Sequence, residues 1–238
     1  MHSSVGSVYI SGLALSNINS DESGDSFTDA TLGVDDGVFH DQDIEFIIAD
    51  GDSQEISPIA EIPIFYKLGP NGEWHKKAGD TFPLIYSGTA GYTGGRLPYN
   101  EWTGDSWVLT EVTNVSYVLY HYFATNDILE PVRAFIGENE YTTKKTARQG
   151  AADEIAAIVL AGLPVSEFVP IATVIFETSN GHSNTPQARI LTNDEGGDYI
   201  DFRSASFISS SGSVTSHGAL SGLADQDHPA TAIITSVT

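Results

Sequence analysis

Hydrophobic residues are most concentrated between residues 107 and 125, where two β-branched and aromatic runs follow each other. Residues 108–112 and 116–123 each indicate a strand, and the short connection at residues 113–115 predicts that they form a central β-hairpin. In the second run both alternating sets of side chains are substantially apolar, so we expect this strand to be covered on both faces. His121 lies within it and is therefore predicted to be a hydrogen-bonded core or interface histidine.

One principal helix is predicted, over about residues 143–161. Thr142 or Thr143 supplies the N-cap, and Gly162 followed by Pro164 ends the helix. Spacings of three and four align an apolar stripe formed by Ala147, Ala151, Ile155, Ile158 and Val159. The first turns carry three basic residues, Lys144, Lys145 and Arg148, although the helix dipole favours acidic residues there. They pair either with acids of the same chain or with acids of a neighbouring chain.

The remaining pattern is mostly that of strands and tight turns. Residues 62–66 are apolar, and the Gly-Pro-Asn-Gly turn at residues 69–72 predicts a hairpin that continues through Trp74 and His75. The other strand candidates are residues 8–10, 46–48, 168–178 and 188–191. This order of elements predicts an α+β fold that is mainly antiparallel β with one principal helix.

Charge and composition divide the chain into three parts. The chain has 238 residues and a formal net charge of −22, yet residues 1–58 contain no lysine or arginine. Such a segment is either a solvated acidic surface or an arm that becomes ordered against a partner. We predict an acidic N-terminal docking segment at residues 1–58, a body domain at residues 59–203, and a Ser/Gly linker with an oligomerising neck at residues 204–238.

The same charge limits the classes of partner. A surface with 32 acidic and 10 basic side chains is repelled by nucleic acid and by anionic lipid. No run approaches eighteen apolar residues, and the N-terminus lacks the pattern of a signal peptide, so we expect the mature chain to begin near Met1. We therefore predict neither a nucleic-acid nor a membrane partner.

Catalytic and cofactor motifs are absent from the sequence. There is no cysteine, no Gly-x-Ser-x-Gly elbow, no phosphate loop and no His-Glu-x-x-His motif. The acidic pairs Asp41/Asp43 and Asp50/Asp52 suggest calcium, but neither continues into a complete calcium loop, so a plain turn is the better interpretation. We predict no enzyme, no cofactor and no metal.

Aromatic residues offer one candidate surface for ligands. The glycine-rich residues 87–99 predict a long exposed loop, and flat rings within and after it are suited to stacking on sugars. Tyr92 and Trp102 are the residues we expect to contact a glycan, although such aromatics more often form core or subunit contacts. A pair of carboxylates that hydrolyses glycosides also remains an alternative, because that chemistry depends on the distance between the two carboxylates, which the sequence does not show.

Near the C-terminus, residues 217–229 read His-Gly-Ala-Leu-Ser-Gly-Leu-Ala-Asp-Gln-Asp-His-Pro. A segment this short cannot bury a core alone, so its leucines pack on the main domain or on the same segment of another chain, and we favour the second. The predicted neck residues are His217, Leu220, Leu223, Asp225, Asp227, His228 and Pro229. Their histidines and aspartates offer ligands for an axial ion, but turn hydrogen bonds and leucine packing are the simpler explanation.

This pattern resembles a segment of tail-fibre and related fibrous structural proteins of tailed bacteriophages. A looser similarity to such proteins extends over residues 122–203, through the motifs Phe-Ala-Thr-Asn at 123–126, Glu-Asn-Glu-Tyr at 138–141 and Pro-Ile-Ala-Thr-Val-Ile-Phe at 170–176. The resemblance implies a homotrimer in the virion that joins the particle to the host-binding apparatus and contacts other virion proteins. The alternative is a carbohydrate-binding module or a glycoside-degrading enzyme that acts on host surface glycans.

Overall fold

The computed structural model describes residues 7–16, 18, 23–41, 44–48, 62–127, 129–158, 160, 163, 168–190 and 199–203. Within these residues the strands are β1 (Val8–Gly12), β2 (Leu15–Ser16), β3 (Gly33–Val34), β4 (Gly37–Asp41), β5 (Ile44–Ile48), β6 (Ile64–Leu68), β7 (Glu73–Lys77), β8 (Pro98–Trp102), β9 (Trp107–Glu111), β10 (Ser116–Thr125), β11 (Val132–Tyr141), β12 (Phe168–Thr178), β13 (Ala188–Ile190) and β14 (Tyr199–Asp201). The helices are the 3-10 helix η1 (Phe27–Ala30) and α1 (Lys144–Ala157). The predicted mainly antiparallel β architecture with one principal helix is confirmed.

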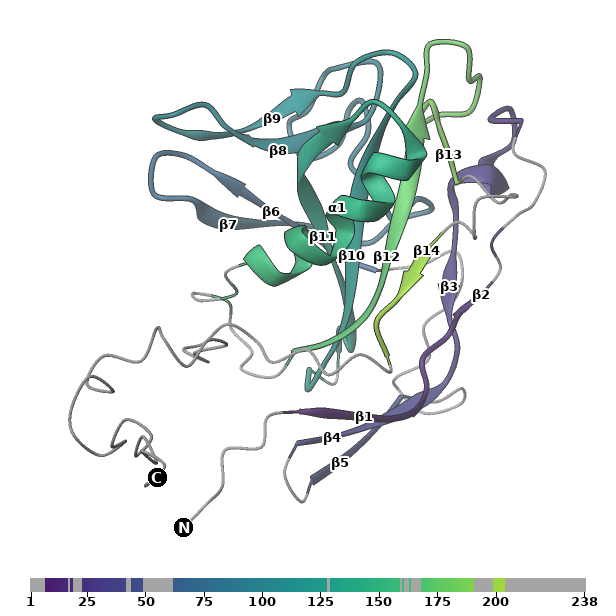
Figure 1. Ribbon diagram of the computed structural model, residues 1–238, viewed down its shortest axis with the longest axis vertical. Helices are drawn as coiled ribbons and strands as arrows, with labels where there is room; N and C mark the ends of the chain where they lie inside the picture. Colours follow the sequence, from purple (N-terminus) through teal and green to yellow (C-terminus); the bar gives the residue numbers. More distant parts are fainter. Residues whose placement is uncertain are drawn as a thin grey trace, which may run out of the picture. The chain divides into compact units, whose positions relative to one another are not determined.

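A seven-stranded sheet forms the centre of the fold (Figure 1). Its strands follow the order β13-β12-β10-β11-β6-β7, and β14 also pairs with β12. The pairing of β11 with β6 is parallel, whereas the other pairings in this sheet are antiparallel. The long strands β10, β11 and β12 lie in the middle of the sheet. β10 and β12 are buried along almost their whole length, which explains their largely apolar sequences, whereas β11 ends in the polar, partly exposed residues 138–141.

The predicted hairpin between residues 108–112 and 116–123 is wrong, although both strands exist. β9 pairs with β8 in a separate two-stranded sheet, and β10 pairs with β11 and β12. The connection between β9 and β10 instead leads from one sheet to the other. Val115, at its end, has a positive φ of 58°, and its N–H donates to the carbonyl of Thr178 on β12. β10 is thereby aligned with β12 rather than folded back on β9.

The two faces of the central sheet carry separate apolar clusters. α1 covers one face, where Ala147, Ala151 and Ile155 pack with Leu119 and Phe135, and Figure 1 shows the helix lying across β10–β12. The opposite face carries the larger cluster, which continues into the loop before β8 and into the N-terminal part of the chain. Burial on both sides of β10 confirms the expectation from its sequence.

α1 begins as predicted and ends earlier. Thr143 is the N-cap, and its hydroxyl accepts a hydrogen bond from the N–H of Thr146. Four of the five stripe residues, Ala147, Ala151, Ile155 and Ile158, are buried, and the fifth, Val159, lies outside the described residues. The last helical residue is Ala157, and Ile158 turns into an extended conformation with ψ 116°. The glycine and proline that we expected to end the helix lie outside the described residues.

The hairpin predicted from residue 62 through His75 is confirmed as β6 and β7, with their turn at residues 69–72. Gly69 and Gly72 have φ values of +79° and +66°, a conformation that favours glycine over other residues. The predicted strands at residues 8–10, 46–48, 168–178 and 188–191 correspond to β1, β5, β12 and β13. Of these residues, Leu191 lies outside the described part.

The N-terminal part of the chain forms a three-stranded sheet, β1-β4-β5, and a two-stranded sheet, β2-β3. Its buried residues Leu13, Leu32 and Phe39 belong to the same apolar cluster as the larger face of the central sheet. Polar contacts accompany this packing, because Arg203 Nη1 donates to the carbonyl of Gly12 at 2.7 Å. The acidic composition of this part therefore coexists with an apolar interior.

Candidate functional site

The predicted neck lies outside the part of the chain that the structure describes. This holds for all seven residues that we expected to form it, His217, Leu220, Leu223, Asp225, Asp227, His228 and Pro229. Asp43, Asp50 and Asp52 of the two aspartate pairs also lie outside it, and Asp41 is the last residue of β4. The neck stays a prediction from the sequence.

The predicted glycan surface is not assembled as expected, because Tyr92 faces inward. Tyr92 is 7% exposed, and its hydroxyl donates to the carbonyl of Arg96 at 2.7 Å. Gly94 permits this close approach, since a Cβ there would lie 2.0 Å from the hydroxyl oxygen. Gly94 is therefore explained by its close contact with the Tyr92 side chain, and not by turn formation alone. Trp102, in contrast, is 45% exposed at the end of β8.

Trp102 belongs to an aromatic group at the ends of two hairpins. Its ring lies 5.6 Å from that of Trp107 on β9. The ammonium of Lys67 lies 4.4 Å from the centre of the Trp107 ring and 5.2 Å from that of Trp74, and it also contacts Glu138 at 2.7 Å. Trp107 and Trp74 are partly buried and serve this packing, so Trp102 is the exposed ring of the group.

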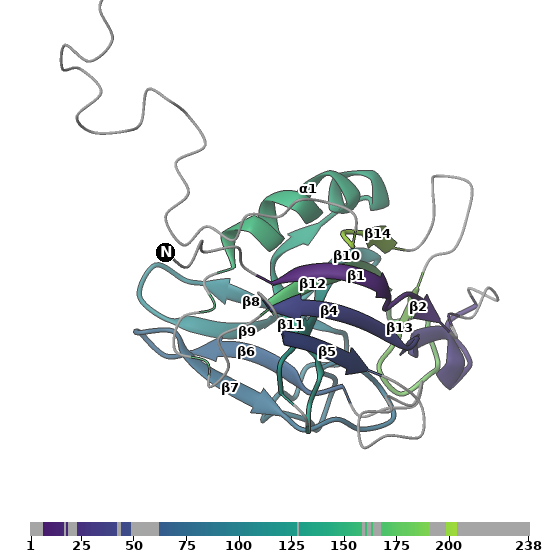
Figure 2. The same ribbon diagram turned by 90° about the horizontal axis from the view of Figure 1, so that it is seen from below.

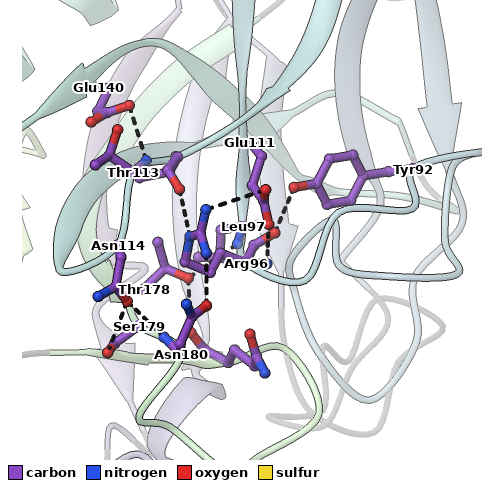
Figure 3. Close-up of polar contacts among 12 residues, drawn as sticks. Tyr92, Arg96, Leu97, Glu111, Thr113, Asn114, Glu140, Thr178, Ser179 and Asn180 are labelled. Atoms are coloured by element: carbon purple, nitrogen blue, oxygen red, sulfur yellow. Dashed lines mark hydrogen bonds and ion pairs between the residues drawn. The ribbon is translucent and has the colours of Figure 1, made fainter.

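A junction around Arg96 explains why the loop before β8 is held inward (Figure 3). Arg96 Nε donates to the carbonyl of Val112 at 2.8 Å, and Nη1 donates to Asn180 Oδ1 at 2.7 Å. Nη2 lies 3.2 Å from Glu111 Oε2, while the Arg96 backbone N–H donates to the other carboxylate oxygen at 2.9 Å. One guanidinium therefore connects three segments that are distant in sequence, and these contacts occupy it within the protein.

The same junction continues through the buried hydroxyl of Thr178 and the exposed side chain of Asn114 (Figure 3). Thr178 Oγ1 accepts a hydrogen bond from the N–H of Leu97 at 3.1 Å and donates to the carbonyl of Gln187 at 2.8 Å. Asn114 Oδ1 accepts from the N–H of Asn180 at 2.9 Å. These bonds satisfy backbone groups at the points where the loops meet, which gives the junction a structural role.

A second polar cluster lies between α1 and the central sheet. His121 is fully buried, with Nδ1 at 2.7 Å from Thr173 Oγ1 and Nε2 at 3.0 Å from Glu154 Oε2. Glu154 Oε1 accepts from the hydroxyl of Tyr141 at 2.8 Å and from Asn139 Nδ2 at 2.9 Å. Both ring nitrogens of the histidine are engaged within the protein, so the prediction of a hydrogen-bonded core histidine is confirmed.

Glu154 also connects the helix to an irregular point in the sheet. The pairing of β10 and β11 shifts register between Val118 and Tyr120, and the N–H of Glu138 in this region donates to Glu154 Oε2 at 3.2 Å. Burial, and then the carboxylate of Glu154, raise the pKa of Tyr141 well above its ordinary value. The tyrosine thus stays a hydrogen-bond donor to Glu154, and the cluster fastens α1 onto the sheet.

Arg133 on β11 is a third buried charge. It is 1% exposed, its Nη2 lies 2.5 Å from Asp127 Oδ2, and its guanidinium lies 5.0 Å from the centre of the Phe65 ring. Burial acts to raise the pKa of Asp127, but hydrogen bonds from the Leu129 and Glu130 backbone and the charge of Arg133 lower it overall. Nε and Nη1 have no hydrogen-bond partner in the described part, yet protein atoms enclose them.

Exposed apolar side chains gather on the β1-β4-β5 sheet. Val8 and Ile10 on β1 are 45% and 47% exposed, and Ile44 and Ile47 on β5 are 55% and 48% exposed. Half of the eight exposed large hydrophobic residues in the described part therefore lie on two short strands. Sequence reasoning identified these segments as strands but not as a surface, because the exposure of a strand depends on the sheet that it joins.

Two further classes of site were sought in the described residues. No group of three or more His, Cys, Asp or Glu side chains there is arranged to hold a metal ion. Nor does this part of the chain contain a helix with the length and apolarity needed to cross a membrane.

Comparisons with known proteins add no assignment. No family model, curated protein or solved structure matches the chain. Inference about function therefore rests on the residues and on the geometry described above.

Proposed function

We propose that this chain is a non-enzymatic structural component of a phage virion, a homotrimeric fibre or fibre adaptor that connects the particle to the host-binding apparatus. The observation that carries the proposal is the pattern of residues 217–229, which resembles a segment of phage fibre proteins. Two leucines, Leu220 and Leu223, supply the apolar contacts of the neck, and the Ser/Gly-rich residues before them act as a linker.

The geometry of the described residues supports a structural role. Its prominent charged side chains are joined to other protein groups, as at Arg96, at Glu154 and at Arg133. Its exposed apolar residues gather on a sheet, which suits contact with a large partner. The acidic N-terminal part docks on other virion proteins, the α+β domain forms the body, and the neck joins three copies.

The test is the molar mass of the full chain in solution by light scattering, for the native sequence and for a Leu220→Asp/Leu223→Asp double variant. The native chain is expected at about three times the monomer mass of 25.4 kDa. Two buried aspartates would oppose association at the neck, so the double variant is expected at lower mass. Leu129→Asp is the matched control, because Leu129 is 85% exposed in a loop of the body domain.

Two results would contradict the proposal. A native chain that stays monomeric at high concentration excludes a stable trimer. A double variant with the native mass and native stability of association places assembly elsewhere than in residues 217–229. Circular dichroism of each variant confirms that a change in mass does not come from unfolding.

A further inference from the structure

A short polar contact joins the N-terminal part of the chain to the connection between β12 and β13. The carbonyl of Gly24 accepts hydrogen bonds from the N–H groups of Ser183 and Asn184 at 2.9 Å and 3.2 Å. Asn184 Nδ2 donates to the carbonyl of Ser26 at 3.0 Å. The two segments, residues 23–26 and residues 182–184, are together named the Gly24 contact. The first of them leads into η1, which lies beside β13 in both views (Figure 1 and Figure 2).

The imidazole of His182 lies inside the Gly24 contact. It is 9% exposed, and a Cβ at position 24 would lie 2.1 Å from its Nδ1. The ring is therefore packed directly against the backbone of Gly24, which is itself buried. Gly24 also has a φ of +75°, a conformation that favours glycine. Both the space and the backbone conformation at this position thus depend on the absence of a side chain.

The two nitrogens of the His182 ring have different surroundings. The ring makes a hydrogen bond with the Ser23 backbone, whereas Nε2 is buried and has no hydrogen-bond partner among the described residues. The neutral ring fits this arrangement with its proton on Nδ1, where it donates to the Ser23 carbonyl. A second proton would lie on Nε2 and leave a charged N–H group buried without an acceptor, which is unfavourable.

The acids near the ring are bound to other groups. Among the described residues, the charges that act on His182 are those of Arg189 on β13, Glu177 on β12 and Asp29 in η1. Glu177 Oε2 lies 2.8 Å from Arg189 Nη2. Asp29 Oδ2 accepts from the three backbone N–H groups of residues 24–26 at 2.8 Å, 3.1 Å and 3.1 Å. Neither carboxylate is hydrogen-bonded to Nε2, and the guanidinium of Arg189 opposes a second positive charge.

We propose that protonation of His182 opens the Gly24 contact, so that residues 23–26 separate from the β12–β13 connection in acid while the central sheet stays folded. An imidazolium that is buried without an acceptor for Nε2–H gains solvation when the contact opens, whereas a neutral ring gains little. The central sheet does not depend on this contact, because β10 is paired on both sides, with β11 and with β12. All of these groups belong to one chain, so the proposal is independent of the proposed trimer.

Hydrogen exchange on the full chain between pH 8 and pH 5 tests the proposal, with each rate corrected for the intrinsic pH dependence of exchange. The N–H groups of Ser183 and Asn184 are expected to exchange about tenfold faster at pH 5 than at pH 8, whereas those of β10 keep their protection. His182→Gln is expected to remove this difference. His75→Gln, at an exposed position on β7, is the matched control that keeps it. Gly24→Ala is expected to open the contact already at pH 8, because its Cβ would occupy the space of the ring.

Four results would overturn the proposal. Corrected exchange at Ser183 and Asn184 that does not change with pH shows that acid leaves the contact closed. Equal acceleration in β10 shows global unfolding instead of local opening. A native pH dependence in His182→Gln places the trigger in another group, and native protection of Gly24→Ala at pH 8 shows that the ring does not pack on residue 24. If His182→Gln is already open at pH 8, His182→Asn replaces it, because its amide can donate to the Ser23 carbonyl in place of Nδ1.

Discussion

At the scale of single residues, Glu154 is the side chain on which most polar contacts between α1 and the sheet converge. Its carboxylate accepts from Tyr141, Asn139 and the Glu138 backbone and contacts His121. Glu154→Gln places an amide N–H₂ against some of these donors and removes a buried charge. We expect a loss of about 2–4 kcal/mol in the free energy of unfolding, measured with urea.

Asp153→Asn is the matched control for this prediction. Asp153 is exposed on the same turn of α1, so its substitution should change stability by no more than about 0.5 kcal/mol. Equal stability of the two variants would show that the buried cluster contributes nothing specific to the attachment of the helix.

His182 gives the fold a dependence on pH. It is 9% exposed, and burial, followed by the charge of Arg189, lowers its pKa below the ordinary value of 6.5, although Glu177 and Asp29 act in the opposite direction. The unfolded chain therefore binds this proton more readily than the folded chain does. The contribution to stability is present above pH 6.5 and is lost as the pH falls below it.

His182→Gln isolates that contribution. The unfolding free energies of the native chain and the variant are compared from pH 8 to pH 5. The native chain is expected to lose more stability than the variant over the acidic half of this range, because the variant has no imidazole to protonate. Parallel curves would contradict the assignment, since they would place the pH dependence in other groups.

Sequence patterns were informative about residues whose environment follows from their own strand. The apolar surroundings of His121 in the sequence were enough to predict a buried, hydrogen-bonded ring. Tyr92 shows the opposite case, because a glycine-rich neighbourhood predicted exposure. Its burial depends on Arg96, which contacts Val112 and Asn180 far along the chain, and no local pattern reports such a contact.

At the scale of elements, Asn100 connects β6 to the β8–β9 hairpin. β11 pairs with β6 only at Ile64 and Phe65. At Lys67, beyond this pairing, the side chain of Asn100 binds the β6 backbone. Its Oδ1 accepts from the Lys67 N–H at 2.6 Å, and its Nδ2 donates to the Lys67 carbonyl at 2.9 Å. Asn100 is 2% exposed, so this amide replaces a strand partner inside the protein.

Asn100→Ala should therefore destabilise the protein strongly. Two buried backbone groups of Lys67 lose their partners, and we expect a loss of about 2–4 kcal/mol in urea unfolding. Asn71→Ala is the control, because Asn71 lies in the exposed turn between β6 and β7 and its side chain donates an exposed hydrogen bond to Glu73. If both variants unfold at the same urea concentration, Asn100 does not hold the hairpin.

The existence of the strands was easier to predict than their partners. Composition identified β9 and β10, but the assumption that neighbours in sequence pair with each other failed there. The pairing of β9 is set by the tight turn to β8, and that of β10 by Val115 and the long strand β12. Strand partners depend on contacts between distant residues, whereas strand formation depends on local side chains.

At the scale of the whole molecule, the proposed assembly is an inference from the sequence. The neck at residues 217–229 is predicted from the sequence and lies outside the described residues. Leu220 and Leu223 are predicted neck residues because their segment has a distinctive pattern, and this stays a prediction.

The measurement that tests the account most directly is the molar mass of the full native chain by light scattering over a wide range of concentrations. The account predicts a stable species of about three times 25.4 kDa that dissociates only on strong dilution. A monomer at every concentration would contradict it, because the proposed neck requires copies of this chain to bind one another.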